Sequence, residues 1–491
     1  MGKGYLILLA GFAAVGSFLF GYDSGVMTNV IASENFLNFF NTNAESNIIG
    51  AINSTFSGGA AIGALMGGYV MDRFGRKIPI QIGAAVAAIG AAIQSGSVSL
   101  GMMLAGRIIA GWAVGILSMS VPVYQGECAP PEHRGLIIGM AQQMIGVGFF
   151  VSAWIGYGCN HAPASSTFQW RFPLAFQCLP ASILAVGMLA FPESPRYLVS
   201  VGRYEEGYET MMKLHFNGSN QEVLDDQFNE MKNVIVAERE MTAPGWTAMF
   251  TVPQWRKRLL IGTLVQVFTQ TTGTNVINYY QTTMYRNLGI KGDMITLMAC
   301  IYNMVGPITN LFFIIFLIDR VGRRKPLLFG TVAIMLCLLL EGICNSQNVD
   351  GSHKGLSGVG VLWIFLVSVF FSLSFGPISW TYMSEVMPMQ IRSTGVAFAT
   401  GIGNWAISTM WAQVSPKGLG QLGWKYYFVF VAINVGITFP TVYFFFPETK
   451  QKTLEEIDNL FGGHIDTAEV LAKKQEKLKQ DTTTVEHVPE V

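Results

Sequence analysis

Charge is scarce in this chain of 491 residues, because only 13% of them are charged and the 31 Lys and Arg balance the 31 Asp and Glu. Soluble proteins carry about 25% charged residues, and a larger core does not remove the need for a polar exterior in water. With 51% hydrophobic residues and a mean hydropathy of +0.40, the composition predicts an integral, multi-pass membrane protein in a lipid bilayer. The zero net charge argues against nucleic acid as a partner.

Cysteine and histidine are also few, with six of each. The cysteines lie mostly in apolar runs without a C-x-x-C pair, so they predict neither a disulfide framework nor a zinc site. The sequence holds no G-x-x-x-x-G-K-[ST] motif, which excludes an ATP-driven pump encoded in this chain. No nucleophile–base or metal constellation points to an enzyme, and we expect no cofactor.

Long apolar runs make up most of the chain. A helix needs about 20 apolar residues to cross the hydrocarbon core, and twelve stretches meet this need. They lie near 5–30, 47–70, 78–97, 101–125, 136–157, 171–191, 256–284, 294–318, 326–346, 358–386, 394–414 and 425–446. We therefore expect an all-α membrane protein with twelve transmembrane helices.

Two polar stretches interrupt these runs and suggest four regions. The predicted regions are an N-terminal six-helix half (1–191), a cytoplasmic helical linker (192–255), a C-terminal six-helix half (256–446) and a cytoplasmic tail (447–491). If linker and tail lie on one side, that side carries most of the Lys and Arg. The positive-inside rule then places both termini in the cytoplasm.

Three charged signatures occur once in each half and in the same order. Asp72-Arg73-Phe74-Gly75-Arg76-Lys77 recurs as Asp319-Arg320-Val321-Gly322-Arg323-Arg324, Glu127 with Arg134 recurs as Glu385 with Arg392, and Pro192-Glu193-Ser194 recurs as Pro447-Glu448-Thr449. The repetition predicts two halves in parallel repeat, an arrangement that places a substrate site between them near mid-membrane.

The charged residues of these repeats can form a latch between conformational states. Arg guanidinium groups can bind carboxylates or helix C-terminal carbonyls across a helix gap. The alternative is that they are ordinary residues of cytoplasmic loops. The predicted latch residues are Asp72, Arg73, Arg76, Glu127, Arg134, Asp319, Arg320, Arg323, Glu385 and Arg392.

Asp23, Arg107 and Glu341 lie inside the apolar part of predicted spans, where charged residues are functional by default. A carboxylate at Asp23 facing a guanidinium at Arg107 would act as a proton switch, because protonation of the acid releases the Arg. The alternative is a static ion pair. Glu341 lies near the outer end of its span, and we expect it to reach water.

Uncharged polar and aromatic side chains gather in spans five, seven, ten and eleven. Such a density of amides is costly in lipid unless it lines a wet cavity. Amides donate to and accept from hydroxyl groups, and aromatic faces stack on sugar C–H surfaces. The pattern predicts a site for a neutral polyhydroxyl solute, although polar contacts between helices explain about half of these residues.

The motifs resemble those of the sugar porter family of the major facilitator superfamily, and fungal hexose and pentose transporters most of all. The resemblance runs from Gly21-Tyr22-Asp23-Ser24-Gly25-Val26 to Pro447-Glu448-Thr449-Lys450. It includes Gly106-Arg107 with Gly111, Glu127 to Arg134-Gly135, and Pro192-Glu193-Ser194-Pro195-Arg196-Tyr197-Leu198.

This resemblance implies a major facilitator fold, alternating access and specific roles for seven residues. It implies that sugar hydroxyls bind to Gln142, Gln270, Asn275, Trp380 and Asn404, and that Tyr279 and Tyr280 form the outer gate. In the family's proton symporters an acid at the place of Asp23 pairs with the Arg that matches Arg107. Some fungal facilitators keep this acid too.

Three positions depart from the family pattern and put the substrate preference in doubt. Thr269 replaces the first of two adjacent Gln, Pro307 stands where an Asn is expected, and Ser379 replaces a second Pro before Trp380.

We expect a secondary transporter of a hexose or pentose in the plasma membrane, coupled to protons and functional as a monomer. A facilitative sugar transporter is the alternative. A sugar sensor that does not transport is a further one, although the tail after Lys450 leaves little room for a signalling module.

Overall fold

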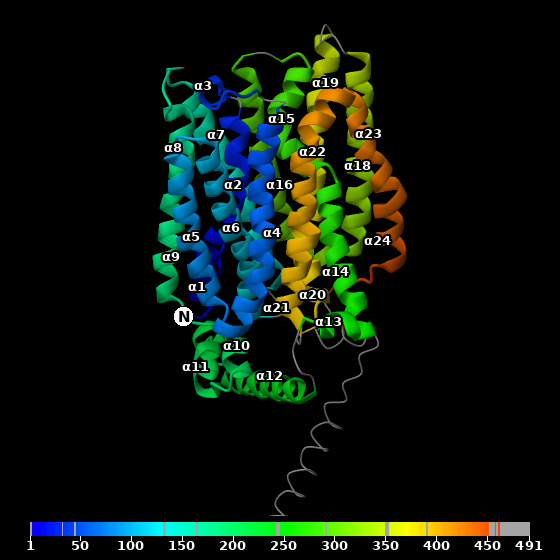
Figure 1. Cartoon of the computed structure of the whole chain (residues 1–491). Coiled ribbons are helices and arrows are strands. Elements are labelled where there is room, and N and C mark those ends of the chain that lie inside the picture. The colour runs from blue at the N-terminus through cyan, green and yellow to red at the C-terminus, as the bar shows by residue number, and fades with distance from the viewer. Residues whose placement is uncertain are drawn as a thin grey trace, which may run out of the picture.

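The computed structural model describes residues 2–31, 33–43, 46–130, 134–163, 165–241, 246–290, 292–348, 353–388, 391–450, 457 and 460–461. These residues are helical or lie in turns and loops, and no strand occurs among them. Figure 1 shows the long helices side by side in one bundle. Three helices, α10 (Pro195–Ser200), α11 (Tyr204–His215) and α12 (Gln221–Met241), lie outside the bundle at one end, which we call the linker end. The other is the distal end.

Six spans form the N-terminal half, and each corresponds to one predicted apolar run. The first is α1 (Gly2–Ala13) continued by α2 (Val15–Val30), and the sixth is α8 (Phe168–Phe176) continued by α9 (Cys178–Gly187). Between them come α4 (Asn47–Phe74), α5 (Lys77–Ser95), α6 (Leu100–Cys128) and α7 (Arg134–Asn160).

Six further spans form the C-terminal half. The first is α14 (Pro253–Thr271) continued by α15 (Thr274–Asn287), and α16 (Met294–Phe316) and α18 (Arg324–Gln347) follow. The fourth is α19 (Lys354–Ser372) continued by α20 (Phe375–Val386). The last two are α21 (Arg392–Phe398) with the π-helical η4 (Ala399–Ala406) and α22 (Ile407–Leu422), and α23 (Tyr426–Ile433) with the π-helical η6 (Asn434–Thr438) and α24 (Phe439–Phe445).

Length and apolarity alone identify 10 membrane-spanning stretches among the described residues. One of them, Arg392–Phe445, is 54 residues long and contains the last two spans. The pair α14–α15 is not one of the 10, because α14 starts with basic residues and ends in amides and hydroxyls. With α14–α15 added and Arg392–Phe445 counted as two spans, the total is twelve. The predicted all-α fold with twelve spans in two six-helix halves is confirmed.

Glycine allows two helices of the N-terminal half to touch backbone to backbone. A Cβ on Gly63 of α4 would lie 2.0 Å from the main-chain oxygen of Trp112, and one on Gly111 of α6 would lie 2.0 Å from that of Phe56. Any larger side chain at these points would push α4 and α6 apart. The close contact fixes the two helices that carry Arg107 and its neighbours.

The spans that face the other half are broken near the middle of the bundle. Gly273 adopts φ 87° between α14 and α15, and Tyr280 interrupts α15 with φ −125° and ψ 16°. Ser374 separates α19 from α20 with φ −142° and ψ −97°. These breaks turn backbone and side-chain polar groups toward the centre of the molecule.

Candidate functional site

A cavity of about 100 Å³ lies between the two halves. At roughly 10–15 Å³ per water, it has room for about seven to ten water molecules, a space that suits a monosaccharide. The described residues that line it include no charged side chain. The N-terminal half contributes Phe20, Gln142, Ile145, Gly146 and Phe149; the C-terminal half contributes Thr269, Gln270, Thr274, Asn275, Asn278, Tyr302, Asn303, Gly306, Pro307, Asn310, Ser368, Phe371, Ser372, Trp380 and Asn404.

Three of the predicted sugar-binding amides form one hydrogen-bonded chain in this cavity. The Gln270 side chain donates to Oδ1 of Asn404, and the Asn275 amide donates to Oε1 of Gln270. Asn275 also donates to the hydroxyl of Ser408 at 2.9 Å. Because each amide orients the next, the chain presents a fixed set of donors and acceptors to a ligand.

Aromatic rings close part of the cavity wall. Trp380 of α20 is 4% exposed and meets the edge of Phe20 at a centroid distance of 6.3 Å. Phe20 also packs on Trp405 at 4.7 Å, and the Trp405 indole donates to Ser118 Oγ at 3.1 Å. Phe20 therefore joins the N-terminal half to the predicted Trp380, a contact that the sequence did not indicate.

The cavity lining also contains polar residues that the sequence analysis did not predict. Ser368 and Ser372 come from one face of α19, and Tyr302 comes from α16. The sequence did hold a signal for these serines, because a spacing of four residues places both on one face of an apolar helix.

Pro307 changes the α16 side of the cavity. It removes one main-chain donor, so the carbonyl of Asn303 lacks its usual partner four residues later. Both residues line the cavity, together with Asn310, whose amide donates to Gln143 Oε1 at 2.8 Å. The departures at Thr269 and Pro307 thus lie in the lining, whereas Ser379 does not.

The two predicted gate tyrosines lie outside the cavity lining. Tyr280 donates to the main-chain oxygen of Ala412 at 2.6 Å and accepts from Asn53 at 3.3 Å. Tyr279 packs beside it with ring centroids 6.3 Å apart. The structure therefore separates them from the five other predicted sugar ligands, all of which line the cavity.

Asp23 and Arg107 are both buried and adjacent, but their side chains do not form the predicted direct pair. The Arg107 guanidinium donates to the main-chain oxygen of Asp23 at 3.3 Å and to that of Ile52 at 3.2 Å. It also faces the Phe56 ring at 4.2 Å. In the described part of the chain, Asp23 Oδ1 and Arg107 Nη2 are buried without a hydrogen-bond partner. The other guanidinium nitrogens bind these main-chain carbonyls and, at 3.5 Å, Gln94 Oε1, so the guanidinium is held beside the carboxyl group of Asp23 without a hydrogen bond to it.

Glu341 does not reach water, contrary to the expectation from its place near the end of α18. It is 0% exposed, because α15, α19 and α23 cover this end of the span.

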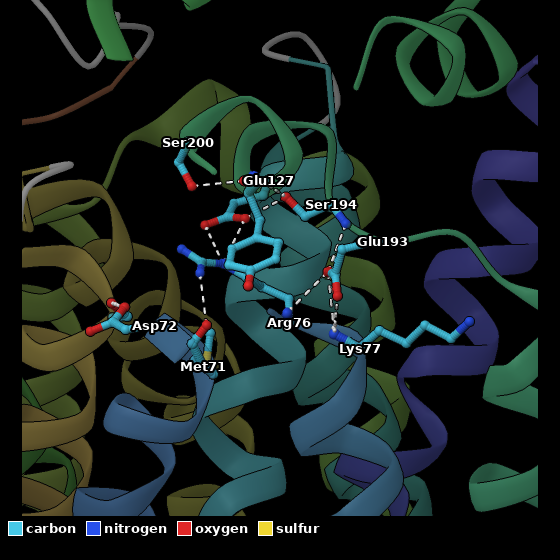
Figure 2. Close-up of polar contacts among 10 residues, drawn as sticks. Met71, Asp72, Arg76, Lys77, Glu127, Glu193, Ser194 and Ser200 are labelled. Atoms are coloured by element: carbon cyan, nitrogen blue, oxygen red, sulfur yellow. Dashed lines mark hydrogen bonds and ion pairs between the residues drawn. The ribbon is translucent and has the colours of Figure 1, made fainter. Parts of the chain in front are cut away.

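At the linker end, Figure 2 shows the first ion-pair network around Arg76. Its guanidinium binds Glu127 of α6 at 3.0 Å and caps the main-chain oxygen of Met71 at 3.1 Å. Ser194 Oγ donates to the same carboxylate at 2.5 Å. Glu193 accepts from the main-chain N–H groups of Arg76, Lys77 and Ser194 at 2.8–3.3 Å, so three segments meet on two carboxylates.

The C-terminal half repeats this network residue for residue. Arg323 binds Glu385 at 2.9 Å and caps the main-chain oxygen of Ile318 at 2.9 Å, and Thr449 Oγ1 donates to Glu385 at 2.7 Å. Glu448 accepts from the main-chain N–H groups of Arg323 and Arg324 at 2.8 Å and 3.0 Å. The sequence repeat is therefore a structural repeat.

Other predicted latch residues take different places. Arg73 is exposed and donates to Tyr69 at 3.0 Å, and the Asp72 carboxylate, to the side of the cluster in Figure 2, accepts from Ser393 of the other half. Arg392 lines a small cavity with Glu127 and Glu385. Arg320 is exposed. The side chains of Arg134 and Asp319 lie outside the described residues.

Charges in these loops shift the pKa values of the groups outside the spans. Burial alone would lower the pKa of Arg76, but the charge and hydrogen bond of Glu127 outweigh it together with the charges of Asp72 and Glu193, so this pKa lies above its usual value. Burial raises the pKa of Glu193, while the N–H groups that it accepts from act in the opposite direction.

The two halves touch on both sides of the cavity. Toward the distal end, Thr28 of α2 donates to the main-chain oxygen of Asn278 at 2.7 Å. Toward the linker end, Ser393 of α21 contacts Asp72 of α4. The cavity therefore lies between two layers of contacts that join the halves, an arrangement in which one layer can open while the other stays closed.

Comparison with known proteins identifies the family. The family described as sugar (and other) transporter matches residues 9–461. The chain belongs to this family. It is 34% identical to the MFS-type transporter criB of Aspergillus cristatus (94% of this chain, 95% of that protein) and 32% identical to the MFS glucose transporter mfs1 of Aspergillus flavus (95% and 91%). A quinate permease of Emericella nidulans is 29% identical (92% and 88%).

The fold matches solved structures of the same superfamily. The E. coli proton:xylose symporter XylE bound to 6-bromo-6-deoxy-D-glucose superposes with a TM-score of 0.80 and 26% identity, over 93% of this chain and 99% of that one. The chain is thus a sugar transporter of the major facilitator superfamily, homologous to glucose and xylose transporters, and not an enzyme.

Proposed function

We propose that this protein moves a hexose or pentose across the plasma membrane by alternating access, with proton symport. The single observation that carries the proposal is the cavity between the halves, lined by amides, hydroxyls and Trp380 without a charged side chain. Neutral polyhydroxyl solutes match such a lining, since amides pair with hydroxyls and rings pack on C–H surfaces.

The same cavity argues against quinate as the main substrate. Quinate carries a carboxylate at neutral pH, and burying an unpaired charge is costly. Quinate is the substrate to compare with sugar, because one relative is a quinate permease. No Lys, Arg or His lines this cavity, and a neutral sugar avoids the cost.

The proposal includes an orientation and a division of the chain. The linker end would face the cytoplasm with both termini, because its loops carry Arg73, Arg76, Lys77 and Arg320 to Lys325. The two halves, 1–191 and 256–446, would move as units around the cavity, with 192–255 as linker and 447–491 as tail. A single chain encloses the cavity, so it would function as a monomer.

In this account the two ion-pair networks act as latches. Each joins the end of one span to the loop after the sixth span of its half, around Glu127 and Glu385. Arg392, between these two carboxylates, would pair with them only while the linker end is closed.

Proton coupling would pass through Asp23. A buried carboxyl group without a donor is favoured in its neutral form, and a hydrated one releases its proton. Alternating exposure of Asp23 to the two sides would therefore carry a proton with each sugar.

The test is uptake of labelled glucose and xylose by transporter-null yeast cells, with external pH recorded in weak buffer. We expect uptake with alkalinisation, and competition by unlabelled sugar but not by quinate. Uptake without a pH change would identify the facilitative alternative. Surface expression without uptake of either sugar would contradict the transport proposal and favour the sensor.

A further inference from the structure

Glu341 of α18 is a second intramembrane acid, far in sequence from Asp23 and outside the cavity lining. It is 0% exposed, and among the described residues both carboxyl oxygens are buried without a hydrogen-bond partner. A Cβ on Gly360 of α19 would lie 2.9 Å from Glu341 Oε2. The glycine thus leaves space for one carboxyl group against α19, and a larger residue would displace it.

Among the described residues, the groups that face Glu341 carry no positive charge. The titratable groups that face it are Tyr285 of α15, Tyr427 of α23 and Cys344 of its own helix, while α19 presents Gly360. The Tyr285 hydroxyl is itself buried without a partner in the described chain. Two tyrosines, a cysteine and a glycine, all uncharged, do not compensate the cost of burying a negative carboxylate. Neutral Glu341, with its proton in place, is the form that this environment favours.

The cover over Glu341 is a helix that is broken from the rest of its span. Tyr285 belongs to α15, and Leu288, which follows α15, would meet the same Gly360 Cβ at 2.9 Å. α15 begins after Gly273, at φ 87°, and is kinked at Tyr280. Figure 1 shows α15, α18, α19 and α23 together at the distal end of the bundle. Movement of α15 about these two breaks would let water reach the carboxyl group.

We propose that Glu341 is a proton-binding site of the C-terminal half, closed off by α15 and opened to water at the distal end when α15 moves. On opening, the carboxyl O–H bond breaks and the proton passes to water; before closing, a proton must return. A deprotonated Glu341 would oppose closure of α15. Transport would therefore slow at alkaline pH on the distal side, independently of Asp23. The inference rests on the proposed transport cycle.

The direct test is infrared spectroscopy of the purified full chain in lipid vesicles. We expect a carbonyl stretch of a protonated carboxylic acid that persists at neutral pH, is lost in Glu341→Gln and is retained in Asp23→Asn. A spectrum in which Glu341→Gln removes no such band would overturn the proposal. If Glu341→Gln does not fold, Glu341→Asp serves in its place, and the band must shift rather than vanish.

The second readout is sugar counterflow, which needs no net proton movement. In the Asp23→Asn background, exchange should fall several-fold from acidic to alkaline distal pH, and adding Glu341→Gln should make it constant at the acidic level. Equal pH profiles with and without Glu341→Gln would contradict the role in transport. Because the infrared band does not depend on sugar, a protein with the band but no sugar flux would refute the proposed function and leave this site standing.

Discussion

Arg107 donates to the main-chain oxygen of Asp23 at 3.3 Å, and not to its carboxyl group. The carboxyl Oδ1 is buried without a hydrogen-bond partner among the described residues. Arg107 thus hydrogen-bonds the main chain of two helices, and the proposed proton exchange at Asp23 would not require a direct ion pair between the two side chains.

Asp23→Asn should abolish accumulation of sugar while leaving exchange intact. Asparagine has the size of the neutral acid but cannot release a proton, so the sugar gradient can no longer follow the proton gradient. One proton across 100 mV supplies about 2.3 kcal/mol, and its loss should reduce steady-state accumulation about fiftyfold or more. Labelled sugar counterflow in the same vesicles is the control, and accumulation by the variant equal to that of the native protein would contradict the role.

Gln270→Ala should weaken sugar binding about tenfold. The substitution removes an amide that contacts both Asn404 and Asn275, and a lost hydrogen bond costs about 1 kcal/mol or somewhat more. The measurement is the KM for uptake. Gln266→Ala, on the same helix but outside the cavity lining, is the matched control. An equal KM change in both variants would mean that the effect comes from the helix and not from the site.

Gly75→Ala should destabilise the linker end. Gly75 has φ 92° and ψ −170°, a conformation that costs other residues about 1–3 kcal/mol, and a Cβ would lie 2.3 Å from Glu193 Oε2. Gly202→Ala is the control, since Gly202 has φ 86° but open space around its Cα. We expect the midpoint of thermal unfolding in detergent to fall clearly more for Gly75→Ala than for Gly202→Ala. Equal shifts would show that backbone strain alone matters.

Removing either buried guanidinium should cost stability in both halves alike. Arg76→Ala leaves Glu127 buried without its cation, as Arg323→Ala leaves Glu385, and breaking such a pair costs about 3–5 kcal/mol. The exposed Arg73 supplies the control, because Arg73→Ala should stay within about 0.5 kcal/mol. Thermal unfolding of the three variants measures this. A shift for Arg76→Ala no larger than that for Arg73→Ala would be the contrary result.

Acid should loosen the contact between the linker and the bundle. His215 Nε2 of α11 lies 2.9 Å from the main-chain oxygen of Cys128, and burial lowers the pKa of His215 below its usual value. The docked linker thus favours neutral imidazole. The contribution of His215 to the free energy of docking is fully present above about pH 6.5. It is lost as the pH falls through the lower pKa of His215 in the docked state.

Limited proteolysis of the linker in inside-out vesicles, over a series of pH values, measures this loss. His215→Gln keeps a donor for Cys128 and should make cleavage independent of pH. His161→Gln, at an exposed site in the turn after α7, should leave the native pH dependence unchanged. Equal acid sensitivity in His215→Gln would place the switch elsewhere.

The sequence predicted the fold well because lipid leaves few alternatives. Twelve apolar runs and repeated loops determine a bundle of two halves. The span α14–α15, which length and apolarity do not identify among the described residues, was counted with the twelve runs of the sequence, and its amides and hydroxyls were interpreted as the lining of a cavity. Gln142, Gln270, Asn275, Trp380 and Asn404 were singled out through the family resemblance, and all five line the cavity. Their contact with sugar stays a prediction.

The rest depended on geometry that residue types do not encode. Ser368 and Ser372 were missed because serine in an apolar helix is ambiguous, and their spacing of four residues does not say whether their shared face meets a cavity. Which oxygen of Asp23 faces Arg107 depends on helix rotation. Glu341 was expected in water because only its distance along α18 was known, not the cover that α15 and α23 provide.

The central claim, proton-coupled transport of a neutral sugar, is tested most directly in vesicles that contain only the purified protein. With an inward proton gradient, we predict that labelled glucose or xylose accumulates above its external concentration, and that a protonophore returns it to equilibrium. Equilibration at the same rate with and without the gradient would contradict the coupling. Flux no greater than in protein-free vesicles, for both sugars, would contradict transport itself.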